Sequence, residues 1–299
     1  MNEMKEHSVA SLGLGLMGAS LGLALRGKGM RVVGYNHSPA NARTALERGA
    51  VDAVAVTLAE AVDGASMVVL AAPVLANIAF ADAIAGALAE GAIVTDMGST
   101  KGEFCRRVAA AHPGMCLVGS HPVAGSEKQG AGAARADLFE SRRCVVTPLP
   151  GTPDDAIRRV EALWHAVGAY TIRMSPEEHD RLLARTSHLP HLVSAALAET
   201  IGRDRAAEVG TFCGPGFCDT TRLAAGSVPM WRDILETNRA AIESELQAFK
   251  DALDALYRDI HSGDSVSWTR FLDRARAARA ALLEGRAASA PSEPPSRTT

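Results

Sequence analysis

The sequence predicts an α/β fold in which an N-terminal doubly wound, mostly parallel sheet is followed by an all-α C-terminal domain. Over the first 174 residues, short apolar segments alternate with alanine-rich helical stretches, which is the pattern of repeated strand–helix–strand units. A glycine-rich turn follows the first apolar segment. Beyond residue 175 the apolar residues recur with helical spacing. We therefore predict a sheet domain at 1–174, a helical domain at 175–285 and a disordered tail at 286–299.

The composition favours a globular protein with a small-molecule ligand. Of the 299 residues, 47% are hydrophobic, which is enough for two cores. The 31 Lys and Arg against 34 Asp and Glu give a net charge of −3 without long runs of one sign, so no basic surface for nucleic acid or an anionic membrane is indicated. No signal peptide or membrane-spanning run is visible, and we expect a cytoplasmic protein. The five cysteines include no C-x-x-C pair, and we expect them to be reduced.

The first predicted strand, 9–12, runs directly into Gly13-Leu14-Gly15-Leu16-Met17-Gly18, and a helical stretch follows at 19–25. A G-x-G-x-x-G motif between a strand and a helix places the pyrophosphate of a dinucleotide at the helix N-terminus. We therefore predict a Rossmann-type domain in which Gly13, Gly15, Leu16, Met17 and Gly18 bind the cofactor. Further strands are predicted at 31–35, 67–72, 92–96, 115–119, 144–148 and 169–174.

The end of the second predicted strand bears on the choice of cofactor. NAD enzymes usually have Asp or Glu there, against the adenosine ribose, but this chain has Tyr35-Asn36-His37-Ser38. Asn36 can hydrogen-bond a ribose hydroxyl, whereas His37 and Ser38, with Arg43 further on, can accommodate a 2′-phosphate. We predict that Asn36, His37 and Ser38 contact the cofactor and leave the choice between NAD and NADP open. The alternative is a simple polar turn.

A serine and a histidine stand just beyond predicted strands. Ser99 lies in Asp96-Met97-Gly98-Ser99-Thr100-Lys101-Gly102, and His121 lies in Gly119-Ser120-His121-Pro122-Val123-Ala124-Gly125-Ser126-Glu127. Ligands of open parallel sheets bind at the carboxyl ends of the strands. We expect His121 in a loop, held extended by Pro122. An imidazole with a pKa of about 6.5 suits removal of the proton of an alcohol that loses hydride. The alternative is a structural histidine bonded to backbone.

The segment Ser175-Pro176-Glu177-Glu178 predicts the start of a long helix, because serine, proline and glutamate at these positions form a capping box. On that helix His188 and His191 are three residues apart and share a face, and Pro190 between them is expected to kink the helix. We predict that both histidines hydrogen-bond the substrate. A metal pair lacks a third ligand at a suitable spacing, so no metal is predicted, and a purely structural pair is the other alternative.

The helical domain contains two further features. Arg222, in Asp219-Thr220-Thr221-Arg222 after a glycine-rich turn, offers a planar fork for a carboxylate, which Asp219 can orient; a surface ion pair or a helix cap is the alternative. Six apolar residues recur at spacings of 4 and 3, namely Ile242, Leu246, Phe249, Leu253, Leu256 and Ile260. Such a stripe packs along another helix, inside the domain or in a second chain, and we expect a homodimer through the helical domain.

From about residue 8 to residue 280 the chain resembles the prephenate and arogenate dehydrogenase family of tyrosine biosynthesis. As a set in this order and separation, the motifs are far more specific than any one of them. The motifs that carry the resemblance are Gly13 to Gly18, Asp96 to Gly102, Gly119 to Glu127, Ser187 to His191, Asp219 to Arg222, and Trp231.

The resemblance implies oxidative decarboxylation of prephenate to 4-hydroxyphenylpyruvate with NAD or NADP: hydride leaves the ring carbon that bears the hydroxyl, the ring carboxylate departs as CO2, and the ring becomes aromatic. It implies that His121 deprotonates the hydroxyl and that Ser99 aligns His121 and the nicotinamide. Arg222 would hold the side-chain carboxylate with His188 or His191 nearby, and Trp231 would line the pocket. The non-acidic Asn36 departs from the family pattern.

Other interpretations of the sequence stay open. Arogenate or an amino-substituted prephenate is an alternative substrate. A β-hydroxyacid dehydrogenase or imine reductase has the same plan but places a lysine or aspartate on the long helix, where this chain has histidines. A non-catalytic NAD(P)-binding redox sensor is the alternative from another functional class, and it would assign no role to His121 and Arg222.

Overall fold

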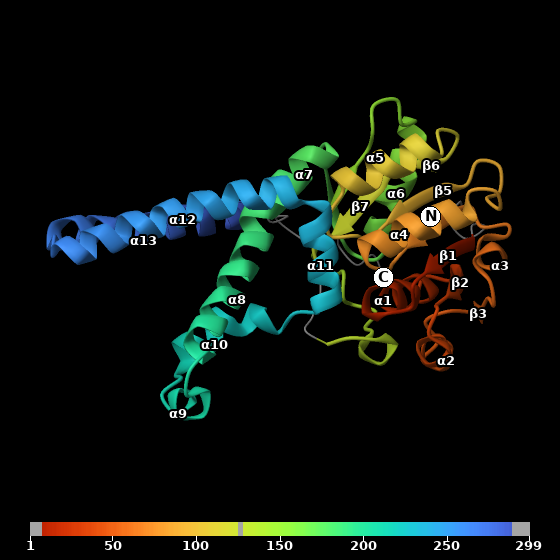
Figure 1. Ribbon diagram of the computed structural model, residues 1–299. Coiled ribbons are helices and arrows are strands. Elements are labelled where there is room, and N and C mark those ends of the chain that lie inside the picture. Colours follow the sequence, from red (N-terminus) through yellow and green to blue (C-terminus); the bar gives the residue numbers. More distant parts are fainter. Residues whose placement is uncertain (1–7, 125–127, 289–299) are drawn as a thin grey trace. The chain divides into compact units, whose positions relative to one another are not determined.

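The computed structural model of the chain describes residues 8–124 and 128–288, which fall into two compact units, 1–239 and 240–299. The first unit holds both sheets, and the second holds two long helices (Figure 1). Within the described ranges, no helix combines the length and the apolar composition that a membrane crossing needs. The boundary at 174/175 between a sheet domain and a helical domain stays a prediction.

A six-stranded parallel sheet of order β3-β2-β1-β4-β5-β6 forms the centre of the first unit and confirms the predicted fold class. Its strands are β1 Ser8–Leu12, β2 Arg31–Tyr35, β3 Ala53–Val54, β4 Met67–Leu70, β5 Ile93–Asp96 and β6 Cys116–Leu117. The two-residue strand β3 was not predicted. The helices between them are α1 Leu16–Arg26, α2 Pro39–Glu47, α3 Leu58–Val62, α4 Val74–Ile84 and α5 Gly102–Ala111.

Both faces of this sheet are buried at its centre, which explains why the central strand β4 is apolar and buried at every position. In β4, Met67 and Val69 belong to a core cluster that includes side chains of α1 and α2, whereas Val68 and Leu70 belong to a second cluster with α3, α4 and α5. The side chains alternate between the faces because successive residues of a strand point in opposite directions. The carboxyl ends of β1, β4 and β5 are thereby held rigidly at one edge of the sheet.

The prediction of one sheet up to residue 174 is wrong, because the last three strands form a separate sheet of order β7-β8-β9. They are β7 Gly119–Pro122, β8 Arg143–Thr147 and β9 Tyr170–Arg173, with a short 3-10 turn at Ala131–Ala133 before β8 and α6 Asp154–Ala166 before β9. Strand β7 pairs antiparallel with β8, and His121 is opposite Val145. The predicted loop around His121 is therefore an edge strand, where a proline such as Pro122 is tolerated.

From residue 176 on, the first unit is mainly helical. The elements are α7 Pro176–Leu183, a π-helical turn Ala184–His188, α8 Leu189–Gly202, α9 Ala206–Gly210, α10 Pro215–Thr221, a 3-10 turn Arg222–Ala225 and α11 Val228–Thr237. Helix α7 begins as predicted, with Ser175 Oγ accepting a hydrogen bond from the backbone N–H of Glu178 at 3.1 Å. Pro190 lies in the first turn of α8, so the irregularity expected there takes the form of the preceding π-helical turn.

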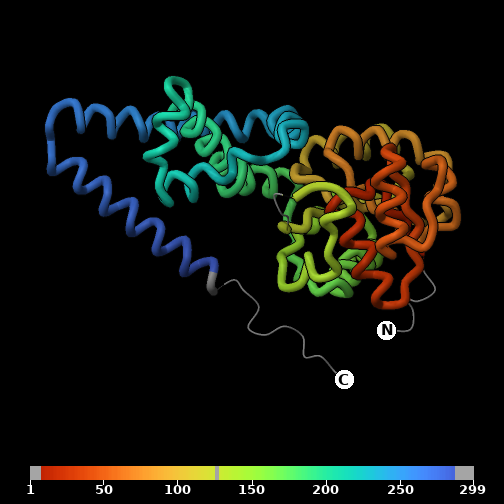
Figure 2. The backbone as a smooth tube through the Cα atoms, turned by 90° about the horizontal axis from the view of Figure 1, so that it is seen from below, coloured from red at the N-terminus to blue at the C-terminus, as the bar shows by residue number. Residues whose placement is uncertain are grey.

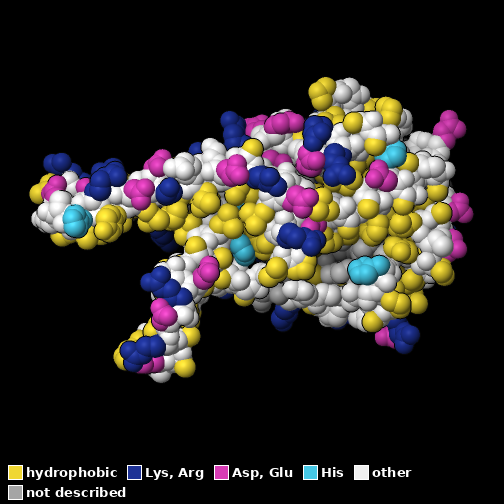
Figure 3. Space-filling model, in the orientation of Figure 1, with side chains coloured by type: hydrophobic (Ala, Val, Ile, Leu, Met, Phe, Trp, Pro, Cys, Tyr) yellow, Lys and Arg dark blue, Asp and Glu magenta, His cyan; other side chains and the backbone are white. Residues whose placement is uncertain are grey.

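The second unit consists mainly of helix α12, Arg239–Ser262, and helix α13, Ser265–Ala288, joined by a turn at Gly263 (Figure 2). In the predicted apolar stripe Ile242 is buried, but Leu246, Leu253 and Ile260 are 42%, 48% and 55% exposed. Hydrophobic side chains are visible over this region in Figure 3. Helix α13 includes Arg286, which was predicted to begin the tail, and residues 289–299 lie outside the described residues.

Candidate active site

The glycine turn between β1 and α1 requires glycine for two different reasons. Gly13 has a φ of +110°, and a Cβ there would lie 2.5 Å from the carbonyl oxygen of Ala71; a Cβ on Gly18 would collide with the carbonyl oxygen of Gly13. At Gly15, no atom of the described residues comes within 4 Å of the position of a Cβ. Packing thus explains Gly13 and Gly18. The open surface at Gly15 fits the close approach of a pyrophosphate to the N-terminus of α1.

A cavity of about 640 Å³ lies beside this turn, within the first unit. Its walls come from the segments after β1, β4 and β5, from β7, from the π-helical turn and from α11 with the loop before it. The predicted site residues that line it are Gly15, Leu16, Met17, Ser99, His121, His188 and Trp231. Residues distant in the sequence, from the glycine turn to Trp231, are therefore gathered around one space at the carboxyl ends of the strands.

Other predicted site residues lie outside the lining. His191 stacks on the indole of Trp231, with ring centroids 3.5 Å apart, so it contacts a wall residue instead of the space itself. Asn36, His37 and Ser38 follow β2, and Ser38 caps α2 by accepting a hydrogen bond from the backbone N–H of Asn41 at 3.4 Å. Their predicted contact with the cofactor stays a prediction.

The structure does not bring Arg222 to the cavity. Arg222 begins the 3-10 turn after α10 and is exposed, as is Asp219, and neither lines the cavity of the single chain. Two cationic side chains that the sequence did not single out, Lys128 and Arg142, do line it. The role of Arg222 as a carboxylate ligand stays a prediction.

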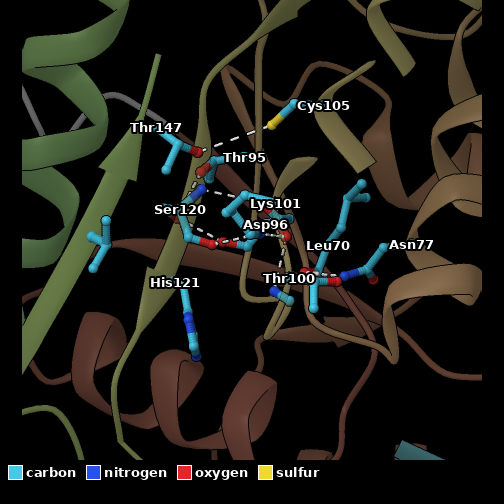
Figure 4. Close-up of polar contacts among 12 residues, drawn as sticks. Leu70, Asn77, Thr95, Asp96, Thr100, Lys101, Cys105, Ser120, His121 and Thr147 are labelled. Carbon is cyan, nitrogen blue, oxygen red and sulfur yellow. Dashed lines mark hydrogen bonds and ion pairs between the residues drawn. The ribbon is translucent and has the colours of Figure 1, made fainter. Parts of the chain in front are cut away.

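His121 is positioned by the alternation of side chains along β7. Its neighbour Ser120 points to the other face, where Ser120 Oγ donates to the carbonyl oxygen of Asp96 at 2.6 Å and accepts from Trp164 Nε1 at 3.1 Å. In Figure 4 the ring of His121 points away from this cluster. Ser120 thus fastens β7 to the end of β5, and the same strand presents His121 to the cavity.

A buried ion pair lies under the segment that carries Ser99. Lys101 Nζ contacts Asp96 Oδ2 and donates to the carbonyl oxygen of Ser120 at 2.9 Å, while the Asp96 carboxylate also accepts from the backbone N–H of Gly98 at 2.8 Å (Figure 4). Both charged side chains are fully buried. Burial raises the pKa of Asp96, and Lys101 opposes that shift. Sequence reasoning missed this pair, because lysine is usually a surface residue.

The ring of His121 is hydrogen-bonded to a histidine that sequence reasoning also missed. His121 Nδ1 lies 2.8 Å from Nε2 of His179, and His179 Nδ1 lies 2.7 Å from Oδ1 of Asp180. Burial, with His179 and Lys101 nearby, lowers the pKa of His121 well below 6.5, and burial also lowers the pKa of His179. The available sequence signal was the His-Asp dipeptide early in a well-capped helix.

His188 is held neutral against the cavity. Asn238 Nδ2 donates to the carbonyl oxygen of Asp180 at 2.8 Å and lies 3.2 Å from Nδ1 of His188. Burial lowers the pKa of His188 to about 4. An amide N–H can only donate, so Nδ1 of His188 accepts and its Nε2 carries the proton. Trp231 meets this ring edge-on, with centroids 5.8 Å apart.

Two family models match the chain. The one described as prephenate dehydrogenase, nucleotide-binding domain, matches residues 21–173, and the one described as prephenate dehydrogenase, dimerization domain, matches residues 175–274. A prephenate dehydrogenase of Bacillus subtilis (strain 168) is 32% identical over 282 residues, covering 92% of this chain and 76% of that protein. A cyclohexadienyl dehydrogenase of Zymomonas mobilis subsp. mobilis is 32% identical over 279 residues, covering 92% of this chain and 95% of its own length.

Solved structures agree with these matches. The crystal structure of prephenate dehydrogenase from A. aeolicus in complex with hydroxyphenyl propionate and NAD+ is similar with a TM-score of 0.86 and 31% identity, covering 92% of this chain and 98% of that one. The Synechocystis arogenate dehydrogenase structure is similar with a TM-score of 0.79 and 27% identity, covering 92% and 99%. The nucleotide-binding domain predicted from the glycine turn is confirmed, with the choice between NAD and NADP open.

Proposed function

We propose, on the premise that this chain belongs to the prephenate dehydrogenase family, that it catalyses the NAD(P)-dependent oxidative decarboxylation of prephenate to 4-hydroxyphenylpyruvate. The observation that carries this proposal is the presence of His121 and the glycine turn on the walls of one cavity. A base and a nicotinamide bound in the same cavity can act on the same alcohol group, the base on its hydroxyl proton and the nicotinamide on the hydride of its carbon. Hydride transfer also requires close and aligned carbons, which a shared cavity can provide.

The residues around the glycine turn fit a nicotinamide dinucleotide. The pyrophosphate would lie on Gly15 and the N-terminus of α1, and Leu16 and Met17 line the cavity next to it. The bound nicotinamide supplies the acceptor for the hydride that leaves the ring carbon bearing the hydroxyl. Asn36 and His37 are proposed to contact the adenosine ribose, and the absence of a carboxylate at these two positions is compatible with NADP as well as NAD.

His121 is proposed as the catalytic base. Its Nδ1 is engaged by His179, so Nε2 is the nitrogen available to accept the proton of the substrate hydroxyl. Ser99, which also lines the cavity, is proposed to align the substrate hydroxyl and the nicotinamide. Removing the hydroxyl proton as hydride departs generates a carbonyl, and loss of the ring carboxylate as CO2 then makes the ring aromatic.

The remaining contacts concern the two substrate carboxylates. His188, with its proton on Nε2, can donate a hydrogen bond to the substrate, and Trp231 forms a flat wall that His191 supports from behind. We propose that Arg222 holds the side-chain carboxylate and not the one that leaves, because strong stabilisation of the departing carboxylate would oppose its loss. Asp219 would orient the arginine.

Arogenate is the alternative substrate, and it differs from prephenate by an amine in place of the side-chain ketone. The similarity to a cyclohexadienyl dehydrogenase and to an arogenate dehydrogenase supports keeping it. The test is to give the purified protein each substrate with each cofactor and to follow the absorbance of the reduced nicotinamide. Reduction with prephenate supports the proposal, reduction with arogenate alone moves the assignment to the alternative, and no reduction in any combination refutes both.

We further propose that the chain is a homodimer through its helical part. The dimerization-domain family model over residues 175–274 and the exposed apolar residues Leu246, Leu253 and Ile260 support this. Light scattering should give a mass twice that of the 31.3 kDa chain. A monomeric mass at micromolar concentration would contradict it.

A further inference from the structure

We propose that His179 and Asp180 form a proton relay with His121: when His121 Nε2 takes the substrate proton, the proton on His121 Nδ1 passes to His179 Nε2, and the positive charge comes to rest on His179 beside Asp180. The inference rests on the proposed function for the source of the proton. The geometry that carries it is the continuous line of hydrogen bonds, 2.8 Å between the two rings and 2.7 Å from His179 to the carboxylate.

The direction of each hydrogen bond follows from the acceptor at the end of the line. A carboxylate oxygen can only accept, so His179 Nδ1 carries a proton. In a neutral imidazole the other nitrogen is then an acceptor, so His179 Nε2 accepts from His121 Nδ1. Nε2 of His121 is left with its lone pair, which is the state that a base requires.

Asp180 is fixed as the end of the relay by the start of another helix. Its Oδ1 accepts from the backbone N–H of Lys101 at 2.7 Å and its Oδ2 from the backbone N–H of Gly102 at 2.8 Å, at the N-terminus of α5. These two hydrogen bonds hold the Asp180 side chain in place, with its Oδ1 2.7 Å from His179 Nδ1. Asp180 is therefore positioned to stabilise the imidazolium that forms on His179.

The charges around the two rings favour the displacement of the proton. His121 faces His179, Lys101 and His188, which disfavour a positive charge on it. His179 also faces Lys101, but Asp180 and Asp96 act on it with negative charge. A proton that remained on His121 would be buried without a counter-ion, whereas the same proton on His179 is paired with a carboxylate 2.7 Å away.

The proton transfers balance without any redox partner. The substrate O–H bond breaks and an N–H bond forms at Nε2 of His121, while the Nδ1–H bond of His121 breaks and an N–H bond forms at Nε2 of His179. When the ring carboxylate leaves as CO2, its bonding electrons make the ring oxygen a phenolate. The His179 proton then returns to Nδ1 of His121, and the proton on Nε2 passes to the phenolate oxygen in the cavity, which His121 lines, so no proton is released overall.

The test is to compare His179→Gln with His179→Ala. The glutamine oxygen can still accept a hydrogen bond from His121 Nδ1 and so orient the His121 ring, but it cannot carry the proton onward. His179→Gln therefore removes the relay while it keeps the orientation of His121. We expect His179→Gln to lower kcat by about 10- to 100-fold, to shift the acid limb of kcat/KM to lower pH, and to change the dependence of rate on the deuterium content of the solvent from curved to linear. A wild-type kcat and an unshifted limb in His179→Gln would overturn the relay.

Control measurements keep a folding defect apart from a loss of the relay. His112, on the surface, makes a 2.8 Å contact with Asp82, so His112→Asn removes a comparable His–Asp pair outside the cavity and should leave kcat and the pH profile unchanged. Binding of NAD+ and thermal unfolding of each variant check that the nucleotide domain is intact.

A readout independent of turnover keeps this proposal distinct from the proposed function. In 15N NMR of the free protein we expect His121 to be protonated at Nδ1. On acidification we expect His179 to take up a proton before His121 does. If wild-type protein reduces neither cofactor, the proposed function fails while this spectrum still tests the relay. If His121 took up a proton before His179, the relay would be overturned.

Discussion

Ser120 and His121 are consecutive residues of β7 whose side chains serve opposite faces of the strand. Ser120 Oγ bonds the carbonyl oxygen of Asp96 at 2.6 Å, and His121 Nδ1 bonds His179 at 2.8 Å. The strand is thereby anchored on one side to the main sheet and on the other to helix α7. The position of the proposed base is thus set by rigid elements, which is a requirement for a productive geometry in hydride transfer.

The buried Lys101–Asp96 pair is predicted to be essential for stability. Lys101→Met leaves the Asp96 carboxylate buried without its cation, which should lower the free energy of unfolding by about 3–5 kcal/mol. Urea denaturation measures this. The matched control is Arg106→Met, which removes one of the two arginine partners of Glu103 at the surface and should have little effect. Equal effects in the two variants would contradict the importance of the buried pair.

The same variant should show a defined dependence on pH. Burial raises the pKa of Asp96 above 3.8 even with Lys101 present. Without Lys101 the folded-state pKa rises further, so the folded protein binds more protons than the unfolded chain between 3.8 and the raised pKa. The wild type shares the lower part of this window, so the destabilisation caused by Lys101→Met should grow as the pH is raised from the folded-state pKa of Asp96 in the wild type to its higher value in the variant. A destabilisation that shrinks with rising pH would refute the assignment.

Alanine substitutions at two glycines of the turn are predicted to have different effects, one on nucleotide affinity and the other on stability. Gly15→Ala points its Cβ into open space, so we expect unchanged thermal stability but an affinity for NAD+ or NADP+ weaker by about tenfold. Gly13→Ala places a Cβ against Ala71 at a φ of +110°, and it should lower the unfolding temperature. Unaltered nucleotide affinity in Gly15→Ala, measured by calorimetry, would argue against a pyrophosphate at this position.

Arg222 is predicted to bind the side-chain carboxylate of the substrate. Arg222→Ala should raise KM for prephenate by about 10- to 100-fold, since a hydrogen bond to a charged group contributes about 1.5–3 kcal/mol, and should leave nucleotide binding unchanged. Arg142→Ala is the comparison, because Arg142 lines the cavity of the single chain. Steady-state kinetics decide: a raised KM in Arg142→Ala alone would transfer the role to Arg142.

The fold was predictable where local patterns determine it. Apolar runs interrupted by Gly and Pro mark β1, β2, β4 and β5, and the glycine motif marks the turn into α1. The partner of a strand is not encoded locally, which is why β7 was assigned to a loop and the second sheet was missed. Pairing of β7 with β8 depends on residues more than twenty positions away in the sequence.

The candidate site was predictable only in part for a similar reason. His121 and Ser99 could be located from their position at strand ends. His179 is 58 residues from His121 along the chain, and nothing near either residue indicates that α7 packs against β7. Lys101 resembles a surface lysine in sequence, and only the fold shows that it is buried beside Asp96.

The most direct test of the account is the turnover of His121→Asn with prephenate, measured together with its affinity for whichever of NAD+ and NADP+ the wild type uses. The account predicts a kcat lower by about 10²- to 10⁴-fold, the usual contribution of an acid–base group, with the dissociation constant for that nucleotide unchanged. A variant that turns over prephenate at nearly the wild-type rate would show that His121 is not the base and would contradict the proposed chemistry.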